Sequence, residues 1–166
     1  MGQNKIIQSF FEDPNRIFGI REISRLVKIP KTTVSRQLNE LVKKRMITKK
    51  DSGYIANESS SYFRLLKKLR FVEDVHRSGL LEYLDERFNP KSVILFGSFA
   101  KGEYNRASDI DIFVQSAEKD YSLSQFEKKL KHPINLFFEE KLSRLSDELF
   151  NNIINGIKLS GYIKIR

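Results

Sequence analysis

Residues 92–114, SVILFGSFAKGEYNRASDIDIFV, contain the pattern that decides the fold of the second half of this chain. The run Ser92–Phe96 predicts a buried strand, because it is short, mostly apolar and rich in β-branched residues. Gly97 follows at once and lets the backbone turn closely at the end of the strand. Ser98 adds a hydroxyl group and a backbone N–H where a helix is expected to begin. The pattern therefore predicts a strand followed by a turn suited to phosphate.

Two aspartates lie on one face of a second predicted strand, Ser108–Val114. Successive side chains of a strand point to opposite faces, so Asp109 and Asp111 share one face and the isoleucines take the other. The two carboxylates are separated by two residues' rise, about 6.6 Å along the strand. Both can lean toward one divalent cation, because such ions bind oxygen ligands. The strand therefore predicts a metal site with these two aspartates as ligands.

The spacing of the two motifs resembles that of a known family. The Gly-Ser pair, ten intervening residues and the Asp-x-Asp motif resemble the polymerase-beta-like nucleotidyltransferase superfamily, especially its minimal branch in prokaryotes. The resemblance extends from about Leu80 to the end of the chain. It implies that Asp109 and Asp111 are catalytic and hold Mg²⁺ ions that bridge the triphosphate of a nucleotide. The nucleotide-binding residues that it implies are Gly97, Ser98, Lys101 and Ser108.

One position departs from the family pattern. The family places a third acidic residue on a neighbouring strand, where it completes the metal site and helps to deprotonate the attacking hydroxyl. The corresponding strand here is His132–Phe138, and its site-facing position is Asn135. An Asn side chain offers a neutral oxygen but cannot act as a general base. Glu139 lies about 13 Å further along the strand, too far to replace the missing acid.

The first third of the chain predicts a small domain of three helices and a β-hairpin. Apolar residues recur at helical spacing in three segments, and two short β-rich segments flank a turn that ends in Gly53. The predicted elements are helices Asn4–Phe11, Ile20–Val27 and Lys31–Lys44 and strands Met46–Thr48 and Tyr54–Ala56. This order is typical of a winged helix-turn-helix domain.

The stretch Ile20–Ile47, IREISRLVKIPKTTVSRQLNELVKKRMI, resembles the helix-turn-helix core of prokaryotic winged-helix transcription regulators. In such proteins the second helix of the pair enters the major groove of DNA. Polar side chains on the outer face of this helix can bond phosphates and base edges, and lysines of the hairpin can meet phosphates. The predicted DNA-binding residues are Lys31, Thr32, Thr33, Ser35, Arg36, Asn39, Lys49 and Lys50. The alternative is a platform that binds only proteins.

Charge is distributed unevenly along the 166 residues, whose formal net charge is +9. Residues 1–57 contain 12 Lys and Arg against 5 Asp and Glu, a net charge of +7, and residues 58–166 carry only +2. A basic domain beside a nearly neutral one favours a nucleic-acid-binding domain joined to a second domain with a different function. The excess charge by itself fits a role in solubility equally well.

The length allows two small domains, and we expect an α+β protein. The predicted divisions are residues 1–57 as the winged helix-turn-helix domain, 58–79 as a helical connector and 80–166 as a nucleotidyltransferase-like domain with a small mixed sheet. The connector is expected to present one apolar face, formed by Tyr62, Phe63, Leu66, Leu69 and Phe71. This face either packs within the chain or forms the interface of a homodimer.

The composition excludes several other kinds of site. The absence of Cys removes disulfides, thiol nucleophiles and Cys-based zinc sites. His76 and His132 are isolated, so we expect packing or surface roles for both and no transition-metal site. The longest apolar run is far shorter than the roughly 20 residues of a membrane-spanning helix, and the first residues do not resemble a signal peptide. We therefore expect no membrane association and a cytoplasmic protein.

These features predict a transcriptional regulator that binds double-stranded DNA through its first domain and a nucleotide with Mg²⁺ through its second. Two carboxylates suffice for one Mg²⁺ with substrate phosphates, but Asn135 predicts weak or absent transfer. The alternative is an active, antitoxin-like nucleotidyltransferase that transfers a nucleotide from a nucleoside triphosphate (NTP) to a protein partner or a small molecule. An aminoglycoside-type modifying enzyme is less favoured, because little chain remains for a substrate domain.

Overall fold

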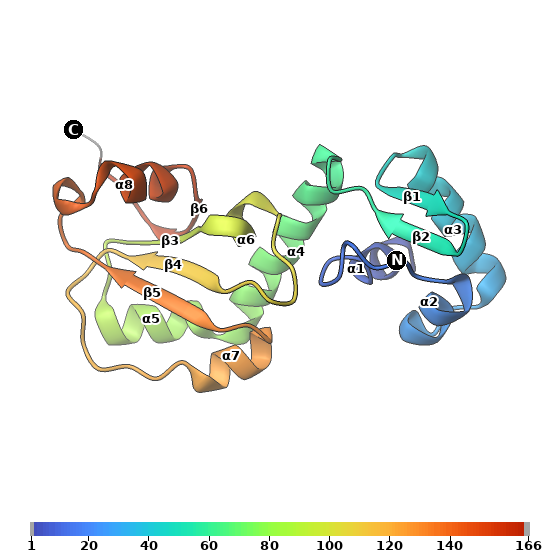
Figure 1. Ribbon diagram of the computed structural model, residues 1–166. Helices are drawn as coiled ribbons and strands as arrows, with labels where there is room; N and C mark the ends of the chain where they lie inside the picture. The colour runs from blue at the N-terminus through green and yellow to red at the C-terminus, as the bar shows by residue number, and fades with distance from the viewer. Residues whose placement is uncertain (1, 165–166) are drawn as a thin grey trace. The chain divides into compact units, whose positions relative to one another are not determined.

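The computed structural model describes residues 2–164, and the chain divides into two compact units (Figure 1). The first unit comprises Met1–Lys67 and Tyr104–Arg106, and the second comprises Lys68–Glu103 and Ala107–Arg166. The outer ends of the predicted domains, residue 1 and residues 165–166, lie outside the described residues. None of the helices in the described part of the chain has the length and apolar character needed to cross a membrane.

Three helices and a two-stranded antiparallel sheet form most of the first unit. They are α1 (Gly2–Gln8), α2 (Ile20–Val27), α3 (Lys31–Lys43), β1 (Ile47–Lys50) and β2 (Gly53–Ala56). Helix α1 ends before the predicted Phe11, because residues 9–11 form turns whose N–H groups bond to carbonyls three residues back. The predicted order of elements is confirmed, whereas the winged helix-turn-helix identity stays a prediction.

Aromatic side chains hold this unit together. The rings of Phe10 and Phe18 meet edge to face with their centres 5.1 Å apart, and Phe11 meets Phe63 at 5.4 Å. Phe18 also forms an isolated bridge to Tyr54 of β2, with backbone bonds of 2.8 and 3.0 Å in the two directions. Since burial of such rings contributes about 2 to 3 kcal/mol each, they fasten the hairpin to the helices. The sequence pattern did not predict the bridge at Phe18.

The second unit contains a four-stranded mixed sheet in the order β5-β4-β3-β6. The strands are β3 (Ser92–Phe96), β4 (Ile110–Val114), β5 (Ile134–Phe138) and β6 (Ile157–Gly161). Strand β4 is parallel to β5, and the other pairs are antiparallel, which confirms the predicted mixed sheet. The helical segments are α5 (Leu80–Phe88), α6 (Gly97–Lys101), α7 (Ser124–Leu130), the 3₁₀ turn η1 (Leu142–Arg144) and α8 (Asp147–Ile154).

Helices cover the sheet of the second unit on both sides. Figure 1 shows α5 and α7 on one side and α8 on the other. Ile94, Phe96 and Phe113 form a cluster with Ile153 of α8, and all four are buried. Every residue of β3 is buried, as its apolar run predicted. This strand is therefore the rigid support from which the following Gly-Ser turn extends.

Serine hydroxyl groups cap the first turns of two helices. The hydroxyl of Ser60 accepts from the Phe63 N–H ahead of α4 (Ser61–Ser78), and Ser146 accepts from Leu149 at the start of α8, both at 3.3 Å. The spacing of Ser124 and Glu127 in the sequence predicts a capping box that opens a helix, but α7 starts without a side-chain cap. Glu127 instead accepts from the Ile134 N–H at 3.0 Å, so a longer-range bond to β5 replaces the local one.

The apolar face expected on the connector is only partly correct. Phe63 and Phe71 are buried in α4, but Tyr62 and Leu69 are 50% and 57% exposed. Residues of an α-helix are about 100° apart, which places Tyr62 and Leu69 on a side away from Phe63 and Phe71. The boundary between the two units falls within this helix, after Lys67. A homodimer formed through the exposed side stays a prediction.

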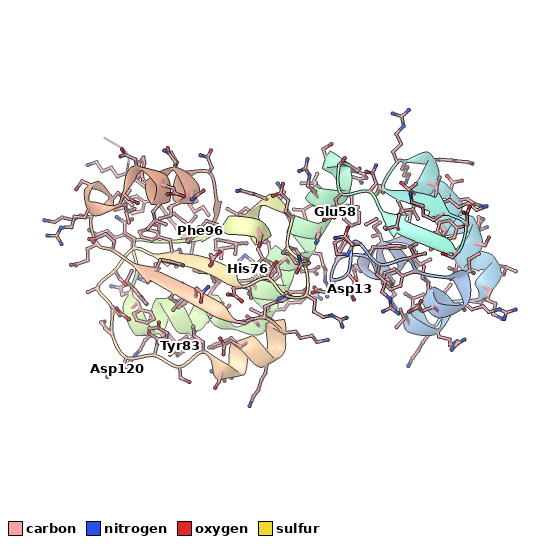
Figure 2. All side chains as sticks on the ribbon, viewed as in Figure 1. Asp13, Glu58, His76, Tyr83, Phe96 and Asp120 are labelled. Atoms are coloured by element: carbon pink, nitrogen blue, oxygen red, sulfur yellow. The ribbon has the colours of Figure 1, made fainter. Side chains whose placement is uncertain are left out.

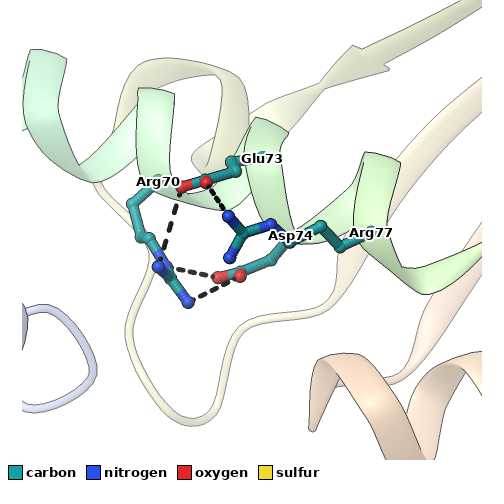
Figure 3. A network of polar contacts seen from close by, with 4 residues as sticks. All are labelled: Arg70, Glu73, Asp74 and Arg77. Carbon is teal, nitrogen blue, oxygen red and sulfur yellow. Dashed lines mark hydrogen bonds and ion pairs between the residues drawn. The ribbon is translucent and has the colours of Figure 1, made fainter.

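Four charged residues form a polar network along α4 (Figure 3). The guanidinium of Arg70 lies 2.8 Å from Asp74 and 3.6 Å from Glu73, and that of Arg77 lies 2.6 Å from Glu73. Such partly exposed pairs three or four residues apart stabilise a helix by a few tenths of a kcal/mol each. The charged residues of this segment therefore stabilise helix α4 through ion pairs with one another.

Lys67 is fully buried on the inner side of α4. Its Nζ donates to the carbonyl oxygen of Tyr104 and lies 4.3 Å from the centre of the Tyr104 ring. Burial lowers the pKa of Lys67 to about 8, although the carboxylates of Glu58 and Glu12 act in the opposite direction. Within the first unit, Lys67 thus holds a segment of the loop that joins the two sequence motifs.

Residues 104–106 have a second attachment in the first unit. The backbone N–H of Arg106 donates to the carbonyl oxygen of Glu12 at 2.9 Å. The guanidinium of Arg106 also lies 2.9 Å from the carboxylate of Asp13, which Figure 2 labels. The segment 104–106 is therefore bound within this unit both at Tyr104 and at Arg106.

The buried amine is expected to make stability depend on pH in the alkaline range. Between pH 8 and 10.5 the unfolded chain keeps the Lys67 proton that the folded chain releases, so stability rises with pH. Relative to Lys67→Met, the free energy of unfolding should increase by up to about 3 kcal/mol across this window. Urea unfolding of both proteins from about pH 7 to 10 measures the difference. A difference that is independent of pH would contradict this expectation.

Candidate nucleotide-binding site

Gly97 lies where β3 ends and α6 begins, directly after Phe96, which is labelled in Figure 2. Its φ angle of +69° is one that residues with a side chain rarely adopt. A Cβ atom built at this position would lie 2.5 Å from Oδ2 of Asp111, which is closer than atoms can approach. Glycine is thus required both for the turn and for the approach of the Asp111 carboxylate.

Asp111 lies between the Gly-Ser turn and Asn135. In the sheet it pairs with Phe96 of β3 on one side and with Asn135 of β5 on the other. The Nδ2 amide of Asn135 donates to Oδ1 of Asp111 at 3.2 Å. One oxygen of the carboxylate therefore faces Gly97, while the other accepts the amide of the residue that occupies the third acidic position.

Asp109 is exposed and lies just before β4, which begins at Ile110 and not at the predicted Ser108. The peptide groups on either side of Asp109 are both bonded to the segment that precedes β5. The Ser108 carbonyl oxygen accepts from Nδ1 of His132 at 2.8 Å, and the Ile110 N–H donates to the Pro133 carbonyl oxygen at 2.8 Å. The side chain of Asp109 thus extends from a backbone that is held on both sides.

The other predicted nucleotide-binding residues lie on or near α6. Ser98 is half-buried in its first turn, and its carbonyl oxygen accepts from the Glu103 N–H at 2.9 Å. Lys101 is exposed at the end of the helix, and Ser108 is half-buried just before Asp109. The structure therefore brings together Gly97, Asp111 and Asn135 directly, while Lys101 lies one helical turn away from the Gly-Ser pair.

Glu139 does not supply the missing acid. Its Oε1 accepts from the Lys141 N–H at 3.0 Å and lies 3.8 Å from the guanidinium of Arg144, so it is engaged beyond the far end of β5. Within residues 2–164, no three or more His, Cys, Asp or Glu side chains gather where they could hold a metal ion. The described site thus contains two carboxylates and one amide.

This donor set fits one Mg²⁺ ion better than two. Mg²⁺ is commonly held by one or two carboxylates together with substrate phosphates and water. Asp109 and Asp111 are two carboxylates of this kind, and Gly97 has no side chain that would clash with Oδ2 of Asp111. The amide of Asn135 already occupies Oδ1 of Asp111 and adds no negative charge. The residues therefore suit a nucleotide with a single bound cation.

Comparison with known families decides the assignment of the second unit. The nucleotidyltransferase domain model matches residues 77–159, half of the chain, and includes both motifs and Asn135. The chain belongs to the nucleotidyltransferase family. The match confirms the resemblance of the Gly-Ser and Asp-x-Asp motifs. A nucleotidyltransferase domain implies nucleotide binding and an NTP substrate, typically with a divalent metal.

Several curated proteins of Methanocaldococcus jannaschii named "putative protein adenylyltransferase" are similar to this chain. One is 37% identical over 62 residues, which cover 37% of this chain and 61% of that protein. A second is 39% identical over 62 residues, covering 37% of this chain and 71% of the relative. A third is 31% identical over 99 residues, covering 60% of this chain and 90% of the relative. The chain thus spans about three fifths of the first relative's length.

The residues predicted to contact DNA lie in the first unit, outside the nucleotidyltransferase match. Four of them line one hollow of about 500 Å³ between α2, α3 and the hairpin, namely Ser35, Asn39, Lys49 and Lys50. Arg21 lines the same hollow, although the sequence pattern did not predict a DNA contact at this residue. The remaining predicted residues lie along α3, where Lys31, Thr32 and Arg36 are exposed and Thr33 is half-buried.

The isolated histidine His132 has a more specific setting than the sequence indicated. It was expected to be a packing or surface residue, and it is buried with 3% of its surface exposed. Its ring also bonds to the Ser108 carbonyl oxygen, next to a predicted metal ligand. A lone His has no sequence pattern that reveals such a contact, because the partner lies 24 residues away.

Proposed function

We propose that the second unit binds an NTP with one Mg²⁺ at the Gly-Ser turn and the two aspartates. The observation that carries this proposal is the approach of Asp111 to Gly97, which leaves a carboxylate beside a turn with room only for glycine. In this proposal Asp109 and Asp111 hold the cation, and the backbone and hydroxyl of Ser98 contact phosphate oxygens. Bound there, Mg²⁺ supplies positive charge that offsets the charge of the phosphates.

The comparisons support ATP as the nucleotide and a protein as the acceptor. The relatives from Methanocaldococcus jannaschii are named as putative protein adenylyltransferases, and one of them is matched over 90% of its length. Adenylyl transfer joins the α-phosphate of ATP to an acceptor hydroxyl and releases pyrophosphate. This assignment supports the enzyme alternative of the two functions that the sequence left open.

Transfer by this nucleotidyltransferase is proposed to be slow. The acceptor hydroxyl must lose a proton as it attacks, and a positioned carboxylate at the third acidic position would take it. Asn135 holds that position, and its amide donates to Asp111 instead of accepting a proton. The chain therefore binds and orients the nucleotide but lacks one group that speeds the reaction.

Nucleotide binding is expected to depend on Mg²⁺ and on Asp111. Calorimetric titration of ATP, GTP, CTP and UTP, with and without Mg²⁺, should show binding that the metal strengthens. Asp111→Asn should lower the affinity for Mg²⁺–ATP at least about tenfold, because it removes one of two anionic ligands. Asp85→Asn makes the same change at an exposed position of α5 and is the matched control. Equal affinity of wild type and Asp111→Asn would contradict the proposed site.

A second function, DNA binding by the first unit, is favoured by the hollow between α3 and the hairpin. The hollow is lined by the hydrogen-bonding side chains of Ser35 and Asn39 and by the positively charged side chains of Lys49 and Lys50. A recognition helix beside a basic hairpin is the arrangement by which a winged helix holds the major groove and the neighbouring phosphates. We therefore propose that the chain is a transcriptional regulator, which binds DNA through its first unit and carries a nucleotidyltransferase domain in its second.

The DNA-binding proposal predicts a specific salt dependence. Arg36→Ala and Lys49→Ala should each weaken duplex binding and lower the slope of log affinity against log salt by about 1, because one phosphate contact releases fewer counterions. Lys158→Ala removes the same charge from exposed β6 in the second unit and should leave the slope unchanged. Fluorescence anisotropy with a labelled duplex measures these slopes. Unchanged affinity in both variants would count against this interface.

A further inference from the structure

His132 contacts both halves of the nucleotidyltransferase motif. It follows α7, where Lys131 adopts a left-handed conformation, and it precedes β5. Its Nδ1 lies 2.8 Å from the Ser108 carbonyl oxygen, and its ring meets the ring of Phe99 edge to face, with centres 4.9 Å apart. One buried side chain thus touches the residue before Asp109 and the residue after Ser98.

The hydrogen bond to Ser108 shows that Nδ1 of the His132 ring carries a hydrogen. A peptide carbonyl oxygen can only accept, so Nδ1 of His132 carries the hydrogen and donates it to Ser108. The next residue, Pro133, accepts from the Ile110 N–H at 2.8 Å. The two peptide groups that flank Asp109 are therefore both held by neighbouring residues of one segment. The backbone at Asp109 cannot shift relative to this segment unless one of these bonds breaks.

The ring contact extends the same restraint to the Gly-Ser turn. Phe99 is fully buried and lies directly after Ser98 in α6. Its ring is 80° from the plane of the His132 ring, an edge-to-face geometry that favours one orientation of both side chains. A movement of α6 toward or away from Asp109 would disturb this contact. His132 therefore relates the position of the turn to that of the carboxylate.

We propose that His132 is a positioning residue, which sets the separation between the Gly-Ser turn and Asp109 for a bound Mg²⁺–nucleotide. This inference rests on the proposed function and adds a residue to the site. Only a side chain that is both an aromatic ring and an N–H donor makes the two contacts together. Phenylalanine would keep the contact with Phe99, and asparagine would keep a donor near the Nδ1 position.

The first test measures the backbone without any nucleotide. In His132→Phe the amide hydrogens of residues 109–110 should exchange at least about tenfold faster, because the bond to Ser108 is lost. His132→Asn should exchange close to the wild-type rate, since it restores a donor. Amide hydrogens in the β3–β4 ladder should exchange equally slowly in all three proteins. Unchanged exchange at residues 109–110 in His132→Phe would overturn the inference, whatever the protein binds.

The second test measures Mg²⁺–ATP affinity by calorimetry beside thermal unfolding. His132→Phe should bind at least about tenfold more weakly than wild type, and His132→Asn should recover part of the loss. Phe88→Leu alters another buried aromatic residue, in α5, and serves as a control for general destabilisation. An equal loss of affinity in this control would overturn a positioning role. Absence of binding in wild type would instead refute the proposed function, and the exchange test would still decide the role of His132.

Discussion

Asn135→Asp is expected to raise the rate of adenylyl transfer about 100-fold or more, the usual contribution of a positioned general base. The substitution keeps the size of the side chain and places a carboxylate opposite Asp111 in the adjacent parallel strand. That carboxylate can accept the proton of the attacking hydroxyl and adds negative charge for a second cation. Transfer of α-phosphate label from ATP to protein, followed with time, measures the change.

Two controls accompany this variant: one makes the same chemical change elsewhere, and the other removes a carboxylate from the proposed site. Asn151→Asp makes an identical chemical change at an exposed position of α8 and should leave the rate at the wild-type level. Asp111→Asn added to Asn135→Asp should abolish the gain, since the new carboxylate acts only beside a bound nucleotide. A rate that stays at the wild-type level in Asn135→Asp would show that the slow step is not limited by the third acidic position.

Gly97→Ala is expected to lower Mg²⁺–ATP affinity at least about 100-fold, because it displaces the Gly-Ser turn and the Asp111 carboxylate together. The added Cβ would lie 2.5 Å from Oδ2 of Asp111, so one of the two must move. The φ angle of +69° adds about 1 to 2 kcal/mol of backbone strain. Calorimetric titration with Mg²⁺–ATP measures the affinity, and thermal unfolding measures the accompanying loss of stability.

Gly79→Ala separates backbone strain from the clash. Gly79 has a φ angle of +81°, but a Cβ there would meet no atom within 4 Å. This variant should therefore lose stability through the same kind of strain and keep its affinity for Mg²⁺–ATP. Comparable losses of affinity in Gly79→Ala and Gly97→Ala would mean that general destabilisation, and not the position of Asp111, explains the effect.

The strands and motifs of the second unit could be predicted from the sequence because they depend on local periodicity. The apolar run of β3 and the alternation around Asp111 repeat every two residues, whatever the strands pair with. The same periodicity identified Asn135 as the site-facing residue, and the register of β4 with β5 pairs it with Asp111. Local pattern and the family resemblance together were therefore sufficient to predict a mixed sheet in this unit.

Other contacts could not be predicted, because their partners are distant in sequence and leave no repeating pattern. The exposed Tyr62 and Leu69 were assigned to the wrong side of α4, since apolar residues alone do not show which side a helix buries. Glu127 was predicted to cap its own helix, yet it bonds to Ile134 in the next strand. In both cases packing between elements overrode the local signal.

The sequence by itself determined the order of elements and the paired aspartates, because residue type and spacing define these features. The resemblance to the family implied that Asn135 occupies the position of the family's third acid. Only the tertiary structure decided that Asp111 lies between Gly97 and Asn135, and that His132 joins the Ser108 peptide to the Phe99 ring. Those contacts arise from strand register and side-chain packing between residues far apart in the chain. Their geometry depends on how the complete sheet is assembled.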